Sequence, residues 1–204
     1  MLVRLKLTSS SFKKMDRKAT NEFLDTKAAG QEAGKFTKQL LPSEAIKPVD
    51  KMIGAIRTAN KNQTLPFDDT SWRILTTEHW HDHNKMMNAL GMDLESTVEE
   101  FIKTYDYWKE RAKVMLNGMY SEADYMTHDE IRDTYRMEVK YRDVPRGSNF
   151  LVDMTDDNTE AIRQSIEQDT NQKLAAAQKD LWMQMLEVTS HFTEVMGDKD
   201  KKFK

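Results

Sequence analysis

The chain has 204 residues, 38% of them hydrophobic and 32% charged, and its formal net charge is −3. The absence of cysteine excludes disulfides, thiol catalysis and cysteine-ligated zinc or iron–sulfur sites. No apolar run approaches the roughly 20 residues that span a bilayer, and no secretory signal core is present, so we expect a cytoplasmic protein with no membrane partner.

Charge is distributed unevenly along the chain. Residues 1–62 hold 13 Lys and Arg against 6 Asp and Glu, a balance of +7, whereas residues 63–204 hold 18 against 28, a balance of −10. This asymmetry indicates a basic N-terminal region that meets an anion or an acidic surface of another copy. The alternative is that these charges belong to solvated helix faces.

The N-terminal third is predicted to contain one strand and two helices. Apolar and basic residues alternate over Met1–Leu7, which predicts a strand with one apolar and one basic face. The basic segment that begins at Lys13 predicts a helix ending near Gly30. Ser43 can cap a second helix over about 44–60.

Two long apolar stripes predict two long helices, because their members recur at intervals of three and four residues. The first helix spans about 76–117, and its stripe consists of Met87, Leu90, Leu94, Val98, Phe101, Tyr105, Trp108, Ala112 and Met115. The second spans about 158–196, and its stripe consists of Ile162, Ile166, Thr170, Leu174, Ala177, Leu181, Met185, Val188, Phe192 and Val195. Neither helix can bury its own stripe, so we expect the two to pack as an antiparallel hairpin.

The segment between the two stripes is predicted to hold a short helix and a β-ribbon. Gly91 marks a position where the first long helix could kink. Thr127 and Glu130 form a capping-box pattern that opens a short helix. Alternating residues over 135–141 predict a strand, which a second strand over 149–153 pairs with.

These patterns predict a mainly α chain of the α+β class. We expect a long antiparallel, coiled-coil-like helical hairpin with a small β-ribbon at about 135–153, beside a basic N-terminal strand–helix region. Residues 1–70 form the N-terminal region and residues 71–204 form the hairpin with its ribbon, together as one cooperative unit.

One histidine cluster has the residue types of a metal site. His79 and His83 are four residues apart, so they share a helix face with Asp82 nearby, and the predicted hairpin brings His191 toward them. Three imidazoles and a carboxylate can bind a divalent transition metal, although the zinc-protease helix motif is absent. The alternative is a set of solvent-facing or hydrogen-bonded histidines without a cofactor.

The N-terminal basic residues suggest a nucleic-acid interface instead. No nucleophile elbow or glycine-rich phosphate loop is present, which favours a non-enzymatic protein. The candidate phosphate-binding residues are Arg4, Lys6, Lys13, Lys14, Arg17, Lys18, Lys35 and Lys38. Phe12, Phe23 and Phe36 lie between them and could stack on the bases of a single strand. One alternative is that the phenylalanines belong to the core and the lysines are solubilising. Another is that the basic region docks on the acidic helices of another copy and forms a homo-oligomer.

Several short elements resemble a known group of sequences. They are Lys38–Pro42, Thr64–Asp68, Trp72–Leu75, Phe101 with Tyr105, Asp124–Met126 before Ile131, Met137–Val139, Val144–Pro145 with Phe150, and Asp180–Trp182 with His191. In this order they resemble a group of uncharacterised proteins encoded by tailed bacteriophages, along nearly the full length. The resemblance implies that the protein acts in the cytoplasm of an infected bacterium. It implies no particular activity.

We therefore expect a non-enzymatic phage protein that self-associates and binds single-stranded nucleic acid or a component of DNA metabolism. One alternative is a protein-interaction module, an inhibitor or trigger of a host system, that uses the long helices to bind a host or phage protein. The other is a metal-dependent activity at His79, His83 and His191.

Overall fold

The computed structural model describes residues 1–30, 32–68, 71–146 and 156–197. Two compact units are built from interleaved segments of the chain. Unit 1 comprises Met1–Arg4, Lys61–Trp80 and Lys140–Lys204, and unit 2 comprises Leu5–Asn60 and His81–Val139. Each unit therefore combines segments that are distant in the sequence.

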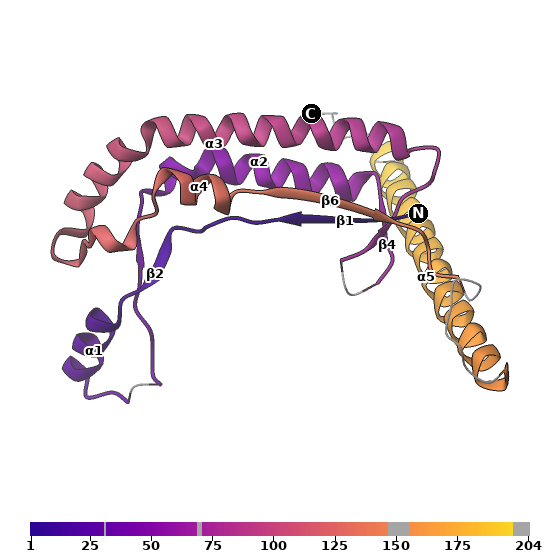
Figure 1. The fold of residues 1–204 in the computed structure, drawn as a ribbon, viewed down its shortest axis with the longest axis horizontal. Coiled ribbons are helices and arrows are strands. Elements are labelled where there is room, and N and C mark those ends of the chain that lie inside the picture. The colour runs from indigo at the N-terminus through magenta and orange to yellow at the C-terminus, as the bar shows by residue number, and fades with distance from the viewer. Residues whose placement is uncertain (31, 69–70, 147–155, 198–204) are drawn as a thin grey trace. The chain divides into compact units, whose positions relative to one another are not determined.

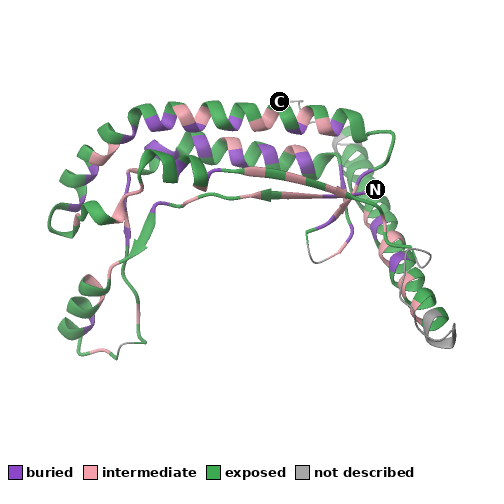
Figure 2. Cartoon of the chain, in the orientation of Figure 1, coloured by how far each residue is buried: buried purple, intermediate pink, exposed green. Residues whose placement is uncertain are grey.

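Two helices that lie side by side form the centre of unit 2 (Figure 1). They are α2 (Ser43–Asn62) and α3 (Trp80–Leu116), and α3 continues through Gly91 without a break. Their facing sides carry the buried residues (Figure 2), which recur every three or four positions as the sequence pattern predicts. The core contributed by the two helices consists of Ala45, Ile46, Val49, Ile53, Ile56, Met87, Leu94, Val98, Phe101, Ile102, Tyr105 and Ala112.

The structure corrects the predicted partner of the long helix. Most of the stripe of α3 is buried in one core with α2, although Met115 near its end is 47% exposed, whereas the stripe of α5 (Asp156–Gly197) is exposed at Leu181, Met185, Val188 and Phe192. Helix α2 is a suitable partner because its own apolar residues repeat along most of its 20 residues. The α+β class, with long helices and a small antiparallel sheet, is confirmed.

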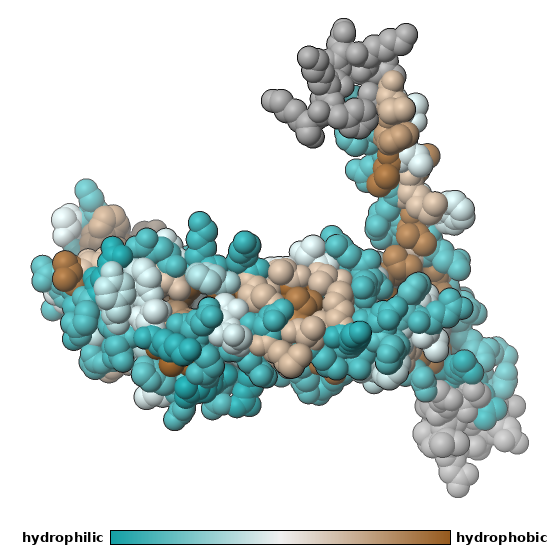
Figure 3. All heavy atoms as spheres, turned by 90° about the horizontal axis from the view of Figure 1, so that it is seen from above, coloured by the Kyte–Doolittle hydropathy of each residue, from teal (hydrophilic) through white to brown (hydrophobic). Residues whose placement is uncertain are grey.

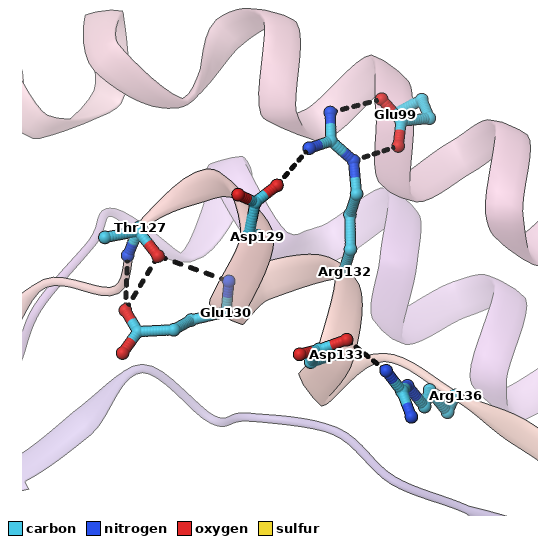
Figure 4. A network of polar contacts seen from close by, with 7 residues as sticks. All are labelled: Glu99, Thr127, Asp129, Glu130, Arg132, Asp133 and Arg136. Carbon is cyan, nitrogen blue, oxygen red and sulfur yellow. Dashed lines mark hydrogen bonds and ion pairs between the residues drawn. The ribbon is translucent and has the colours of Figure 1, made fainter.

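Helix α4 (His128–Thr134) begins with the predicted capping box (Figure 4). The hydroxyl of Thr127 accepts a hydrogen bond from the backbone N–H of Glu130, whose carboxylate accepts one from the backbone N–H of Thr127. Arg132 of this helix donates to both carboxylate oxygens of Glu99 on α3, at 2.6 and 3.0 Å. The short helix is thus fixed at its start and tied to α3.

A four-stranded sheet has the order β4-β5-β1-β6. The strands are β4 (Leu65–Pro66), β5 (Arg73–Ile74), β1 (Leu2–Leu7) and β6 (Met137–Arg142). Both β1–β5 and β4–β5 pair in the antiparallel sense. The predicted strands over Met1–Leu7 and 135–141 are confirmed by β1 and β6, and the expected second ribbon strand over 149–153 lies outside the described residues.

Unit 1 has a small core of its own around Trp72, which is buried with Leu2 and Phe67. The guanidinium of Arg142 lies 3.9 Å from the centre of the Trp72 ring, and that of Arg4 lies 4.9 Å from it. The first half of α5 packs here as well, since Thr170 donates to the backbone carbonyl of Pro145 at 3.3 Å and Ala177 is buried. Among the described helices, none is both long enough and apolar enough to cross a membrane.

Candidate nucleic-acid interface

The basic segment of the N-terminal third forms a two-stranded ribbon with a helix at its end, here called the basic arm (residues 13–39, in unit 2). Strand β2 (Lys13–Met15) pairs antiparallel with β3 (Thr37–Gln39), and α1 (Arg17–Thr26) lies between them in the sequence. Asp16 caps α1 by accepting the backbone N–H of Ala19 at 3.0 Å. The predicted helix therefore begins four residues later than the basic segment, because Lys13–Met15 pairs with β3 instead.

A buried ion network anchors the arm to the rest of unit 2. The ammonium of Lys38 lies 2.7 Å from Oδ2 of Asp124 and 3.2 Å from Oδ2 of Asp16, and it donates to the backbone carbonyl of Met119 at 2.7 Å. The side chain of Lys38 is only 7% exposed. Lys14 adds a second cation, 2.8 Å from Oδ1 of Asp124.

The network favours the charged form of both the lysine and the aspartates. Burial lowers the pKa of Lys38, but its hydrogen bonds and charge attraction to Asp124 and Asp16 outweigh burial and raise it. Hydrogen bonds from Lys14 and Lys38 lower the pKa of Asp124. The backbone hydrogen bond from Ala19, followed by Lys38, lowers the pKa of Asp16. Lys38 is therefore a structural cation whose charge is matched inside the protein, and the expectation that it binds phosphate is corrected.

The other predicted phosphate-binding residues occupy different positions. Lys6, Lys13, Arg17, Lys18 and Lys35 are exposed in unit 2, and Lys14 is half exposed despite its ion pair. Within the part of the chain that the structure describes, no carboxylate lies at ion-pair distance from Lys13, Arg17 or Lys35. Arg4 belongs to unit 1, where its guanidinium stacks on Trp72. The arm thus offers several cations to a ligand.

Two of the three interleaved phenylalanines are accessible. Phe23 on α1 is 58% exposed and Phe36, just before β3, is 41% exposed. Phe12 is different, because its ring is buried in the core of unit 2, in an edge-to-face contact with Phe101 at 5.7 Å between ring centres. The expected stacking role is therefore corrected for Phe12, which packs with α3 instead.

A groove beside the arm was missed by the sequence reasoning. Its volume is about 880 Å³, and it lies between the turn that follows β1, the ribbon and the first turns of α2. Its lining consists of Ser9, Ser10, Ser11, Lys13, Gln39, Ser43, Glu44, Ile46, Lys47, Asp50 and Lys51. Lys47 and Lys51 are four residues apart, so they share one face of α2, and that spacing was the available sequence signal.

The histidine cluster is arranged differently from the expectation. His79 precedes α3 and contacts the Thr76 hydroxyl through Nδ1 at 2.6 Å, whereas His83 is fully buried with Nε2 3.0 Å from Oδ1 of Asn60. Asp82 and His191 are both exposed. Burial lowers the pKa of His83, which favours the neutral imidazole. Among the described residues, no group of three or more side chains is placed to hold a metal ion.

Comparisons of the chain with protein-family models, with curated proteins and with solved structures found no match. We therefore infer function from the residues and their geometry.

Proposed function

We propose that this protein binds single-stranded nucleic acid, without catalysis, along the basic arm and the groove beside α2. The observation that carries the proposal is the position of Lys13, which is exposed on β2 of the arm and also lines the groove. Lys13 therefore lies with Lys47 and Lys51 of α2 around one groove, and Arg17 follows four residues later at the start of α1. Cations spaced in this way match the repeated phosphates of a nucleic-acid backbone.

The aromatic side chains of the arm favour a single strand over a duplex. Phe23 on α1 and Phe36, which follows Lys35 in the sequence, are exposed, and an unpaired base can stack on an exposed ring. Bases in a duplex are already stacked on each other, so they gain nothing from such rings. Binding of this kind tolerates many sequences, because every base presents a flat face.

The groove adds hydrogen-bonding groups to these cations. Ser9, Ser10 and Ser11 line it together with residues of the first turns of α2. Hydroxyls and ammonium groups both donate to phosphate oxygens. Glu44 and Asp50 also line the groove, but Glu44 is paired with Arg111 at 3.0 Å, which reduces its repulsion of a phosphate.

The biological setting that we propose is the cytoplasm of a phage-infected bacterium, where single-stranded nucleic acid is exposed during replication and transcription. The resemblance to tailed-phage proteins supports this setting. A role beside a component of DNA metabolism is compatible with such binding.

The test is fluorescence anisotropy of a labelled single-stranded oligonucleotide of about 20 nucleotides, titrated with the full chain at low salt. We expect binding that weakens at least tenfold in the variant Lys13→Gln, Arg17→Gln, Lys18→Gln, Lys35→Gln. The matched control removes four exposed cations elsewhere, with Lys85→Gln, Lys103→Gln, Arg163→Gln and Lys179→Gln. Because both variants change the net charge equally, a similar loss in both contradicts a defined site, and no binding by the unmodified chain contradicts the proposal.

A further inference from the structure

The second half of α5 carries a large exposed apolar surface that the nucleic-acid proposal does not use. Figure 3 shows apolar side chains along the helix that rises at the upper right. Eight large hydrophobic residues between 181 and 196 are each at least 41% exposed: Leu181, Trp182, Met183, Met185, Leu186, Val188, Phe192 and Met196. The first half of the same helix differs, because Thr170 and Ala177 are buried within unit 1.

This surface is too apolar for a helix that stays in water. Between Leu181 and Met196 the only acidic residues are Glu187 and Glu194, and that stretch contains no Lys or Arg. At 3.6 residues per turn, both glutamates fall on the side opposite Met185 and Phe192. The exposed area of the eight hydrophobic side chains is on the order of several hundred Å², as large as the largest apolar patch of a typical monomer, and a patch of that size often marks a protein–protein interaction site. A partner that covers this side is therefore expected.

The spacing of the stripe indicates that the partner is a helix. Residues recur at intervals of 11 in three parallel rows: Ile166, Ala177 and Val188; Thr170, Leu181 and Phe192; Leu174, Met185 and Met196. An 11-residue repeat corresponds to 3.67 residues per turn, so the stripe runs nearly parallel to the helix axis. A second, nearly straight helix can follow such a stripe over its whole length.

The segment is complementary to itself in the antiparallel direction. A two-fold axis between Val188 and Thr189 sets Met185 opposite Phe192 of a second copy, and it sets Leu181 opposite Met196. The first pair is a favourable contact between sulfur and an aromatic ring. Because a two-fold axis repeats each contact, the same few residues cover the stripe on both helices.

The charges of the segment are compatible with this pair. Glu187 and Glu194 lie on the side away from Met185 and Phe192, so neither carboxylate is buried when the apolar sides of two copies meet. The overlap also ends before Ala177, where α5 becomes buried in unit 1.

We propose that residues 181–196 of α5 pair antiparallel with the same residues of a second copy, so that the protein is a dimer. Several hundred Å² buried on each copy approaches the roughly 1,000 Å² in total that a specific interface needs. The proposal is independent of nucleic-acid binding, since it uses a different helix and unit.

Sedimentation velocity of the full chain tests the dimer. The monomer mass is 23.8 kDa, and we expect twice this mass at micromolar concentration. Phe192→Glu places a charge in the centre of the stripe and should weaken dimerisation at least a hundredfold, with an unchanged circular dichroism spectrum. Val114→Glu is the control, because Val114 is 84% exposed on α3, outside the proposed interface. A monomeric unmodified chain overturns the proposal, even if another protein binds α5, and so does a Phe192→Glu variant that remains a dimer.

Disulfide trapping tests the direction of the pair. The chain has no cysteine, so Met185→Cys and Phe192→Cys chains each carry a single thiol. We expect an oxidised equimolar mixture to form the mixed disulfide dimer several-fold more than either self-linked dimer. Preferential self-linking of Met185→Cys and of Phe192→Cys would indicate a parallel pair and overturn the antiparallel proposal.

Discussion

The buried ammonium of Lys38 lies 2.7 Å from Oδ2 of Asp124, and this ion pair joins the basic arm to the segment that follows α3. Asp16, the capping residue of α1, binds the same ammonium at 3.2 Å. One lysine thus holds the ribbon, the start of α1 and the short helix η2 (Glu122–Asp124) together. The arm that we propose to bind nucleic acid depends on this lysine for its position, although Lys38 itself is not accessible to the ligand.

We predict that Lys38→Met destabilises the protein by about 3 kcal/mol, because removing one partner of a buried ion pair leaves the opposite charge uncompensated. The free energy of unfolding from urea titrations measures this effect. Lys18→Met is the control, since Lys18 on α1 is 89% exposed, and we expect it to change stability by less than about 0.5 kcal/mol. Equal stability of the two variants would show that the network contributes little.

We predict that acid weakens the fold through the same carboxylates. Hydrogen bonds from Lys14 and Lys38 hold the pKa of Asp124 below its usual value of 3.8, so the unfolded chain takes up the proton first as pH falls. The stabilisation from ionised Asp124 is complete well above pH 3.8 and is lost as pH drops through the lower, folded-state pKa. Urea titrations at pH 7, 5 and 3 should show that the free energy of unfolding falls more for the unmodified chain than for Asp124→Asn. The same loss in both would rule out this carboxylate as the cause.

We predict that His83 stays neutral at pH values where a histidine of the unfolded chain is already protonated. Burial lowers its pKa below the usual 6.5, so its contribution to stability is present above pH 6.5 and decreases as pH falls below that value. Long-range ¹H–¹⁵N NMR of the imidazole nitrogens follows the protonation directly, and the urea-unfolded chain supplies the reference. Protonation of His83 at pH 6.5 or above would contradict the lowering of its pKa by burial.

We predict that Gly91→Ala stabilises the protein by about 0.5–1 kcal/mol. Helix α3 is continuous at this glycine, and alanine has the higher helix propensity. A β-carbon at this position would lie 3.9 Å from Cε and Sδ of Met137, which is ordinary van der Waals contact. Thermal unfolding measures the gain, and Gly54→Ala on the exposed side of α2 should give a similar one. A marked loss of stability in Gly91→Ala alone would indicate that Met137 cannot adjust.

Local signals in the sequence predicted individual elements well. The alternation over Met1–Leu7, the serine at the start of α2 and the Thr127–Glu130 capping box each act over a few residues, and the structure has a strand or helix at each place. The stripe of α3 also predicted which side of that helix is buried. Such signals depend on backbone geometry that the residues themselves determine.

Long-range pairing was harder to predict, because an apolar stripe does not identify its partner. Helices α2 and α5 both offered a face to α3, and the choice of α2 depends on packing that spacing does not encode. The strand pairing of Lys13–Met15 with β3 was missed for a similar reason, since three residues carry too little pattern. Lys38 resembled the neighbouring lysines in the sequence, and only the positions of Asp16 and Asp124 distinguish it.

The measurement that tests the proposed function most directly is the salt dependence of oligonucleotide binding. Each phosphate contact to a single strand contributes about 0.7 to the slope of log affinity against log salt concentration. We predict a negative slope for the unmodified chain, reduced in magnitude by about 3 when Lys13, Arg17, Lys18 and Lys35 are all replaced by Gln. An affinity independent of salt, or a slope that the four substitutions leave unchanged, would contradict phosphate binding by the basic arm.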